Sequence, residues 1–355
     1  MDSITGTKYI HYGDIHTRKF TRIENDGLLP NIIDHNYISL ENGDVVVADA
    51  SEDYKGIADA CIVDRSKSNY KIIAGLHTIA FRPNNKLKAN FLYNYFSTSI
   101  FKHYGYKMGT GLKVFGITYN NLANMIIKIP DIQEQTKINE ILNTITKLLS
   151  LQQRKLKLVY QLKKTLLEQL ISEKGEPIVR FNSFRKEWER FRLENFITKT
   201  IKGKAKAEMV GNRSIYLDTS YLNGGTPSTV DAPTDVYIND TIILWDGSLA
   251  GKVYHGFSGA LGSTLKTFKP KYSGEYLFQY LQKSQEKIFK NYRTPNIPHV
   301  IKDFTTVFRI NAPSLEEQNK ISAIFELIDR FTSNQSITIN KLKKIKRSLL
   351  QKLFI

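Results

Sequence analysis

The side chains that most often perform catalysis are scattered along this sequence of 355 residues. The seven histidines show no pair at helical ligand spacing, and the single cysteine, Cys61, cannot build a thiolate metal site or a disulfide framework. No phosphate-binding loop of the G-x-x-x-x-G-K-[ST] type occurs, and the glycines of residues 109–116 lack the spacing of a dinucleotide loop. Asp49 and Asp246 each end an apolar run without a base nearby in sequence, so we interpret them as turn or capping residues. The pattern does not favour an enzyme.

Recognition of a polyanion is the chemistry that the charge favours. Lys and Arg number 51 against 34 Asp and Glu, a formal net charge of +17. Nucleic acid is favoured over a membrane surface because no basic amphipathic helix stands apart, although a basic protein with incidental charge is the alternative. No apolar run approaches the length of a membrane span, and the start of the chain lacks the features of an export signal. With one cysteine, we expect a cytoplasmic protein.

Polar and basic loops supply the candidate contacts to nucleic acid. Arg and Lys suit phosphates and guanine edges, and Asn suits adenine. In the first half of the chain the candidates are His11, Tyr12, Thr17, Arg18, Lys19, Lys107, Thr110 and Lys113. In the second half they are Tyr221, Thr226, Ser228, Lys252, Tyr254, His255, Tyr292, Arg293, Thr294, Asn296 and His299. A solvated surface role is the alternative for each residue taken singly, whereas the loops taken together favour contact with DNA.

Two long helices must position these loops, and the sequence contains them as a repeat. The segment from Pro130 and the segment from Pro313 align without a gap, at an offset of 183 residues. Each begins with a proline, a capping residue (Asp131 or Ser314) and a glutamate three positions later, which together predict a capping box. Apolar residues then recur at steps of three and four. A helical arm of roughly 40 residues spans about 60 Å.

Gln152 and Gln335 interrupt the apolar face of the two arms at the same repeat position. A polar residue at such a position fixes register in a coiled coil. Each glutamine lies near the middle of its arm, so antiparallel pairing would bring the two amides together. The alternative is that both are tolerated polar positions in a solvated layer.

The rest of the chain predicts two mixed α+β domains. Short strand-like runs precede a helix at residues 89–104, with Ile100 on its buried side, and a strand at 125–130 leads into the first arm. The second domain repeats this order, with one helix over 275–292. We expect domains at 1–130 and 176–312 and arms at 131–175 and 313–355. The second domain has an additional segment, residues 180–210, so the first is either truncated or completed by another part of the structure.

These features resemble the specificity subunits of Type I restriction-modification systems. One motif is the arm opening P-x-x-x-E-Q-x-K-I, present as Pro130, Glu134, Gln135, Lys137 and Ile138 and again as Pro313, Glu317, Gln318, Lys320 and Ile321. A second is the arm end, Lys163, Lys164, Leu166, Leu167 and Leu170, repeated as Lys346, Arg347, Leu349, Leu350 and Leu353. A third is R-F-x-x-F-x-x-x-W at Arg180, Phe181, Phe184 and Trp188. The first domain departs from the family because it lacks this third motif.

The resemblance implies a non-catalytic subunit with two target-recognition domains, each reading one half of a bipartite site in double-stranded DNA. The arms would pair as an antiparallel coiled coil that sets the spacer and docks two methyltransferase subunits, with restriction and translocase subunits joining afterwards. The methyltransferase subunits would carry S-adenosylmethionine, and this chain would bind no cofactor or metal. Two alternatives are a coiled-coil scaffold with incidental basic charge and a self-sufficient methyltransferase or nuclease. The second is disfavoured because the sequence lacks an N/D-P-P-Y/F tetrapeptide and metal ligands.

Overall fold

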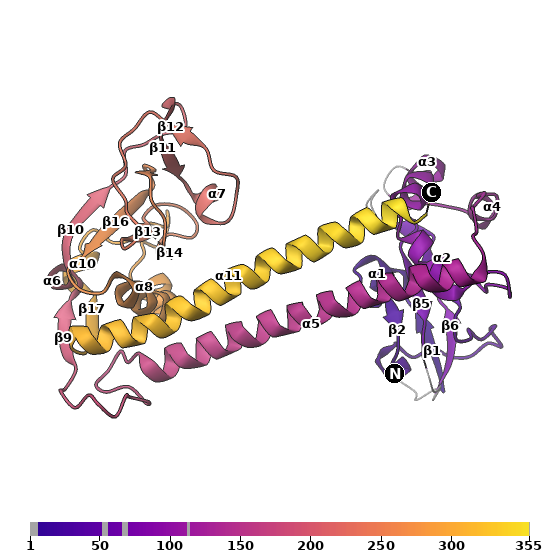
Figure 1. Ribbon diagram of the computed structural model, residues 1–355, viewed down its shortest axis with the longest axis horizontal. Coiled ribbons are helices and arrows are strands. Elements are labelled where there is room, and N and C mark those ends of the chain that lie inside the picture. Colours follow the sequence, from indigo (N-terminus) through magenta and orange to yellow (C-terminus); the bar gives the residue numbers. More distant parts are fainter. Residues whose placement is uncertain (1–5, 52–55, 66–69, 112–113, 355) are drawn as a thin grey trace. The chain divides into compact units, whose positions relative to one another are not determined.

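The computed structural model describes residues 6–51, 56–65, 70–111 and 114–354 (Figure 1). The chain forms two compact units. The first unit combines residues 1–153 with 337–355, and the second comprises residues 154–336. Two long helices, α5 (Ile132–Leu170) and α11 (Leu315–Lys352), each contribute to both units.

The first unit is organised around a four-stranded sheet in the order β2-β5-β3-β7. Its elements in chain order are β1 (Thr7–Ile10), α1 (Tyr12–His16), β2 (Arg22–Ile23), η1 (Asp26–Leu28), β3 (Val45–Ala48), β4 (Ala50–Ser51), β5 (Ala60–Val63), β6 (Lys71–Ala74), β7 (Thr78–Phe81), α2 (Ala89–Phe96), α3 (Ser99–Met108), β8 (Phe115–Gly116) and α4 (Tyr119–Ala123). Strand β3 is fully buried because alternate residues face opposite cores. Val45 and Val47 pack towards α2, whereas Val46 and Ala48 pack with Ile15 of α1.

The second unit is organised around a four-stranded sheet in the order β10-β16-β13-β14, beside a three-stranded sheet in the order β12-β11-β15. Its elements are β9 (Glu189–Arg192), α6 (Leu193–Phe196), β10 (Ile197–Lys202), β11 (Val210–Leu217), α7 (Thr219–Leu222), β12 (Thr229–Val230), β13 (Thr241–Leu244), β14 (Val253–His255), β15 (Ala260–Leu261), β16 (Leu265–Pro270), α8 (Gly274–Lys283), α9 (Gln285–Asn291), α10 (Phe304–Val307) and β17 (Arg309–Ala312). Helix α8 packs against the larger sheet through Tyr276, Leu277 and Tyr280, which are buried in the same core as Ile243 and Phe268.

The predicted helices at 89–104 and 275–292 are each divided in two. The hydroxyl of Thr98 accepts a hydrogen bond from the backbone N–H of Phe101 at 3.2 Å, so a new helix begins there and α2 is separate from α3. The prediction that Ile100 is buried is wrong, since its side chain is 43% exposed. In the second unit the division falls at Ser284, between α8 and α9.

The predicted strand at residues 125–130 is also wrong, since this segment forms no ladder. Its counterpart in the second unit is β17, which pairs antiparallel with β9. Strand β9 belongs to the additional segment 180–210, which has no counterpart in the first half of the printed sequence. A strand needs a neighbour to satisfy its backbone groups, and none of the described residues of the first unit pairs with this segment.

Each unit packs the beginning of one long helix with the end of the other (Figure 1). In the first unit, Ile138 and Leu142 of α5 share a core with Leu349 and Leu350 of α11. In the second unit, the end of α5 shares a core with the beginning of α11, through Leu166, Leu167, Leu170, Ile321, Phe325 and Ile328.

One half of each predicted capping box is confirmed, namely the hydrogen bond from the glutamate N–H to the side chain of the capping residue. The carboxylate of Asp131 accepts a hydrogen bond from the N–H of Glu134 at 2.8 Å, and the hydroxyl of Ser314 accepts one from Glu317 at 3.4 Å. The carboxylate of Glu317 binds Arg180. The capping oxygens therefore define where both arms begin.

Candidate nucleic-acid interface

The first unit brings His11 and Tyr12 to a polar cluster around Asp49 and His77. The Nδ1 atom of His77 lies 3.3 Å from a carboxylate oxygen of Asp49, and the ring of Tyr12 meets that of His77 edge to face at 5.6 Å. His11 stacks at a tilt on Tyr12, with 4.7 Å between ring centroids, and its Nδ1 accepts from the N–H of Gly13 to cap α1. Sequence reasoning missed His77 as a partner of Asp49.

Thr110 lies beside this cluster because it bridges to Gly116 of β8, and β8 pairs with β4, the strand that begins directly after Asp49. The backbones of Thr110 and Gly116 exchange two hydrogen bonds, and Ile117 donates to the carbonyl of Asp49 at 2.8 Å. Lys107 is exposed in the last turn of α3. Lys113 lies outside the described residues.

Thr17, Arg18 and Lys19 form the exposed turn after α1. Arg18 has a left-handed backbone, with φ of 57°, and a guanidinium nitrogen 3.8 Å from Asp59. Lys19 pairs with Asp14 at 3.2 Å. The side chain of Arg18 is 72% exposed, which leaves its charge accessible to a ligand.

In the second unit, two loops that contain candidates come together. Asp246, which follows β13, forms a β-bridge with His299. Arg293 donates to the carbonyl of Ser248 at 3.2 Å, and Thr294 donates its N–H to the carbonyl of His299 at 3.0 Å. Asn296 is exposed between them. This arrangement presents an amide side chain at the end of a braced loop.

A second group of candidates lies around Asn223. Lys252 donates to the side-chain oxygen of Asn223 at 2.6 Å, and Tyr221 contacts the ring of Phe257 edge to face. Thr226 and Ser228 are exposed in the loop that leads to β12. The candidates of the second unit thus fall into two groups.

Tyr254, His255 and Tyr292 do not have the exposed positions predicted for DNA contact. Tyr254 is 6% exposed within a core cluster, and Tyr292 packs against Phe304 and Phe308. The ring of His255 stacks on Phe278 of α8, with 5.2 Å between centroids. All three side chains are amphipathic, and their aromatic bodies are used for packing. We therefore remove them from the candidate interface.

His255 belongs to a polar network that joins the sheet to both long helices. Its Nε2 atom lies 3.2 Å from the carboxylate of Glu275, which accepts a hydrogen bond from Gln279 at 2.6 Å. Gln279 also donates to Asp329 at 3.1 Å, and Asp329 pairs with Lys163 at 2.7 Å. Burial raises the pKa of Glu275 to about 7 and lowers the pKa of His255. We call this network the second joint.

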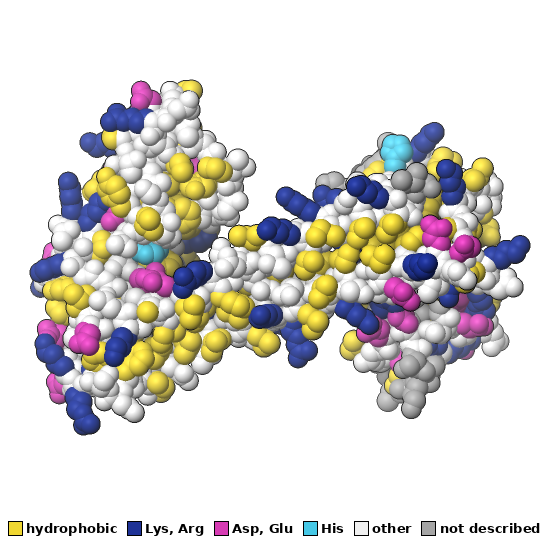
Figure 2. All heavy atoms as spheres, in the orientation of Figure 1, with side chains coloured by type: hydrophobic (Ala, Val, Ile, Leu, Met, Phe, Trp, Pro, Cys, Tyr) yellow, Lys and Arg dark blue, Asp and Glu magenta, His cyan; other side chains and the backbone are white. Residues whose placement is uncertain are grey.

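Sequence reasoning missed a basic cluster beside the Asp246 loop. The ammonium of Lys266 lies 3.3 Å from the ring centroid of Trp245, in a cation–π contact. Burial and then the like charge of Lys202 lower the pKa of Lys266. Lys202, Lys204 and Lys206 were the available signal, since residues at every second position lie on one face of an extended segment. Figure 2 shows Lys and Arg side chains spread over both globular parts.

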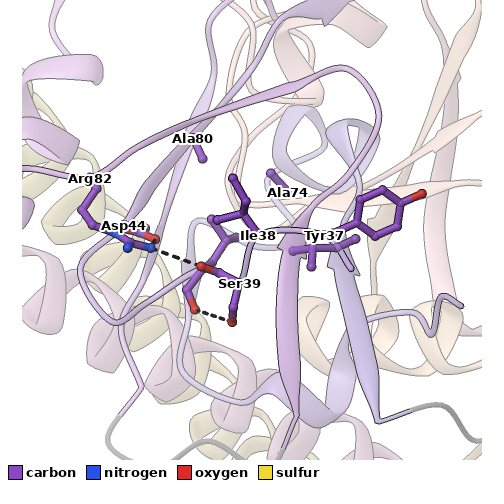
Figure 3. Close-up of a pocket in the computed structure, with 9 residues that line it drawn as sticks. Tyr37, Ile38, Ser39, Asp44, Ala74, Ala80 and Arg82 are labelled. Carbon is purple, nitrogen blue, oxygen red and sulfur yellow. Dashed lines mark hydrogen bonds and ion pairs between the residues drawn. The ribbon is translucent and has the colours of Figure 1, made fainter. Parts of the chain in front are cut away.

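A pocket of about 480 Å³ lies in the first unit, lined by Tyr37, Ile38, Ser39, Leu40, Asp44, Ile73, Ala74, Ala80 and Arg82 (Figure 3). Arg82 donates to Asp44 from Nε at 2.9 Å and from Nη2 at 2.8 Å, and also to the carbonyl of Ser39 at 3.1 Å. Its charge is therefore compensated within the wall, and the pocket offers a largely apolar surface.

Within the described part of the chain, no group of three His, Cys, Asp or Glu residues could hold a metal ion. None of the described helices combines the length and apolar character needed to cross a membrane.

Comparison with known proteins identifies the family. The model of the Type I restriction modification DNA specificity domain matches twice, over residues 18–161 and 185–347. The two matches cover most of the chain, so the chain belongs to this family, as the sequence motifs predicted.

The Type I restriction enzyme MjaVIII specificity subunit of Methanocaldococcus jannaschii is 35% identical over 179 residues. The match covers 47% of this chain and 42% of that relative, so it spans less than half the length of the curated protein.

Two solved structures share the fold. The crystal structure of a Type I restriction-modification S subunit from M. genitalium superposes with a TM-score of 0.66 at 14% identity, covering 95% of this chain and 89% of that chain. A structure described for complex assembly and conformational transition of the type I R-M system gives 0.59 at 18% identity, covering 98% and 90%. The prediction of a mixed α/β fold with two domains and long helices is confirmed.

Proposed function

We propose that this chain is the DNA specificity subunit of a Type I restriction-modification complex. Each unit reads one half of a bipartite site in double-stranded DNA. The single observation that carries the proposal is the double match to the DNA specificity domain, with one match centred on each unit. The net charge of +17 supports a polyanionic partner.

We also propose that α5 and α11 pair as an antiparallel coiled coil between recognition domains at 1–130 and 176–312, with arms at 131–175 and 313–355. The packing of opposite helix ends within each unit supports this arrangement. Gln335 is buried and Gln152 is half-buried, as expected for polar residues that set register within the pair. At 39 residues, α5 has a length of about 58 Å, enough to separate half-sites one DNA turn apart, about 34 Å.

The long helices would dock the partner subunits. Helix α5 carries an exposed apolar stripe formed by Ile141, Leu148, Leu151, Leu158 and Leu162. Their spacing places them on one face of the helix. Figure 2 shows hydrophobic side chains along the visible face of the helices. Such a stripe supports contact with two methyltransferase subunits, which restriction and translocase subunits then join.

In this proposal the chain is a non-catalytic cytoplasmic subunit. The methyltransferase subunits bind S-adenosylmethionine and transfer the methyl group. The residues of the candidate nucleic-acid interface position DNA by contacts to phosphates and base edges.

Mapping of methylated bases across the genome, with and without this gene, tests the function. We expect one bipartite motif to lose methylation on deletion and to regain it when the full chain is restored. Co-purification of the tagged full chain should recover a methyltransferase subunit. An unchanged methylation map in the deletion strain would contradict the proposal.

A further inference from the structure

The repeat allows the joint between globular part and long helix to be compared in the two units. In the second joint, Lys163 of α5 is one turn before Leu166 and Leu167, which pack on the core. The repeat counterpart of Lys163 is Lys346 of α11, one turn before Leu349 and Leu350, which pack on the core of the first unit. Lys346 therefore faces the first globular part in the way that Lys163 faces the second.

The acids of the second joint have no acidic counterparts in the first. Asp329, which pairs with Lys163, corresponds to Thr146 at the same offset of 183 residues. Glu275 of α8 corresponds to Asn90 of α2 in the alignment of the two domains. Thr146 donates its hydroxyl to the carbonyl of Leu142 at 2.7 Å, as a neutral helix residue does.

Arginines occupy the first joint instead. Arg22 donates to the side chain of Asn90 at 2.8 Å, and its guanidinium carbon lies 5.8 Å from the ring centroid of Tyr93. Tyr93 corresponds to Phe278, on which His255 stacks in the second joint. Burial first, and then the like charges of Arg18 and Arg22, lower the pKa of Lys346. We call Arg18, Arg22 and Lys346 the first joint cluster.

The carboxylates near the first joint cluster already form ion pairs. Arg22 binds Asp64, and Asp59 binds Lys102 at 2.5 Å besides its longer contact with Arg18. Lys346 has no ion-pair partner among the described residues. The cluster therefore holds more positive than negative charge, whereas Lys163 in the second joint is paired with Asp329. An unpaired, half-buried cation is costly unless a ligand compensates it.

We propose that Arg18, Arg22 and Lys346 form a phosphate-binding site for the DNA backbone. At the corresponding position of the second unit, the carboxylate of Asp329 neutralises Lys163, so no phosphate binds there. The site deepens the proposed function and rests on it. Arg18 lies in the exposed turn that also holds Thr17 and Lys19, so the cluster continues the candidate interface. The two units would thus hold DNA unequally, with an additional backbone contact on the first.

The test introduces an acid at Thr146, the position that corresponds to Asp329. Thr146→Asp should recreate the pairing of Asp329 with Lys163, and Lys346→Met should remove the cation while keeping its apolar stem. In each variant of the full chain, the slope of log affinity against log salt concentration should become less steep by about 1, because one phosphate contact contributes about that much to the slope. Affinity at low salt should fall about tenfold, the loss of one charge-assisted hydrogen bond.

Thr144→Asp is the matched control. Thr144 also donates its hydroxyl to the carbonyl four residues earlier, at 2.8 Å, and the substitution makes the same change in charge. It lies two residues away, about 200° around the helix, so its acid points away from the joint. The probe is duplex DNA that carries the methylated motif, and thermal unfolding of each variant shows whether it is folded.

Equal salt slopes for Thr146→Asp and Thr144→Asp, or an unchanged slope for Lys346→Met, would overturn the site. Loss of the methyltransferase subunit with an unchanged slope would instead assign the cluster to an acidic segment of that partner and also overturn the proposal. Failure of the unmodified chain to bind the motif would contradict the proposed function itself, so the two failures are distinguishable.

Discussion

Arg180 and Glu317 bind each other through two hydrogen bonds, from Nε to Oε1 at 2.9 Å and from Nη2 to Oε2 at 2.9 Å. Glu317 is 1% exposed, so its carboxylate depends on this partner. The pair joins the R-F-x-x-F-x-x-x-W motif to the arm opening. In the first unit the repeat counterpart of Glu317, Glu134, is exposed, and the segment that contains Arg180 has no counterpart in the first half of the printed sequence.

Arg180→Met should destabilise the second unit. Removing one partner leaves a buried carboxylate uncompensated, which costs about 3–5 kcal/mol of the free energy of unfolding. Arg180→Lys should recover part of the loss, because lysine keeps the charge without the planar fork. Urea unfolding measures both. Arg185→Met, an exposed arginine in the same segment, is the control. If both methionine variants are equally stable, the pair has no structural role.

The arms were predictable because their signals are local. Caps at Asp131 and Ser314 and apolar steps of three and four are contained within a few residues. The strand at 125–130 was mispredicted because a strand depends on a distant neighbour, which is β9 in the second unit. The division between α2 and α3 depends on Thr98, and periodicity does not detect a cap within a continuous apolar pattern.

The candidate site was predictable by residue type more than by position. Exposed loops with Thr17, Arg18 and Asn296 were found, whereas the contact of His77 with Asp49 depends on the pairing of β3 with β7. Lys266 and Trp245 meet through the pairing of β13 with β16. Such contacts join residues far apart in sequence, so spacing along the chain contains no sign of them.

The second joint should make stability depend on pH. The Nδ1 atom of His255 lies 3.0 Å from the carbonyl of Asp240, which can only accept, so Nδ1 carries a proton. The 3.2 Å contact between Nε2 of His255 and the carboxylate of Glu275 then requires one further proton, which is lost as pH rises through about 7. Other titratable groups near Glu275 are Asp329, Lys163 and Glu326.

Burial raises the pKa of Glu275 from 4.5 to about 7, so the folded state binds more protons than the unfolded state between these values. The carboxyl's contribution to stability is full below pH 4.5 and is lost as pH rises through 7. Glu275→Gln should therefore gain stability relative to the unmodified chain between pH 5 and pH 8, by roughly 2 kcal/mol, since the lowered pKa of His255 opposes part of the effect.

Thermal unfolding across this pH range measures the difference. Glu286→Gln on α9 is the control, because Glu286 is exposed. Parallel pH profiles for Glu275→Gln and the unmodified chain would exclude a proton held at the second joint.

Asn296→Ala should relax base recognition in one half-site. The exposed amide fits an adenine edge, and loss of such a contact costs about 1–3 kcal/mol of discrimination. Methylation mapping of a strain that carries the variant should show degeneracy at one position of one half-site, with the other half-site unchanged. Asn291→Ala, an exposed asparagine at the end of α9, should leave the motif intact. Degeneracy in both half-sites would argue against separate readers.

Length of the paired helices should set the spacing between half-sites. Insertion of seven residues after Gln152 and after Gln335 extends each helix by about 10.5 Å and preserves the heptad pattern of apolar residues. At about 3.4 Å per base pair, the spacer of the methylated motif should grow by about three base pairs. Both half-sites should keep their sequence, because the recognition domains are untouched. Insertion in one helix is the control, since it makes that helix about 10.5 Å longer than the other, so that the helix ends no longer pack together in both units, and it should abolish methylation. A motif with an unchanged spacer after the double insertion would contradict the proposed spacing role, and altered half-sites would show that the helices contribute to base recognition.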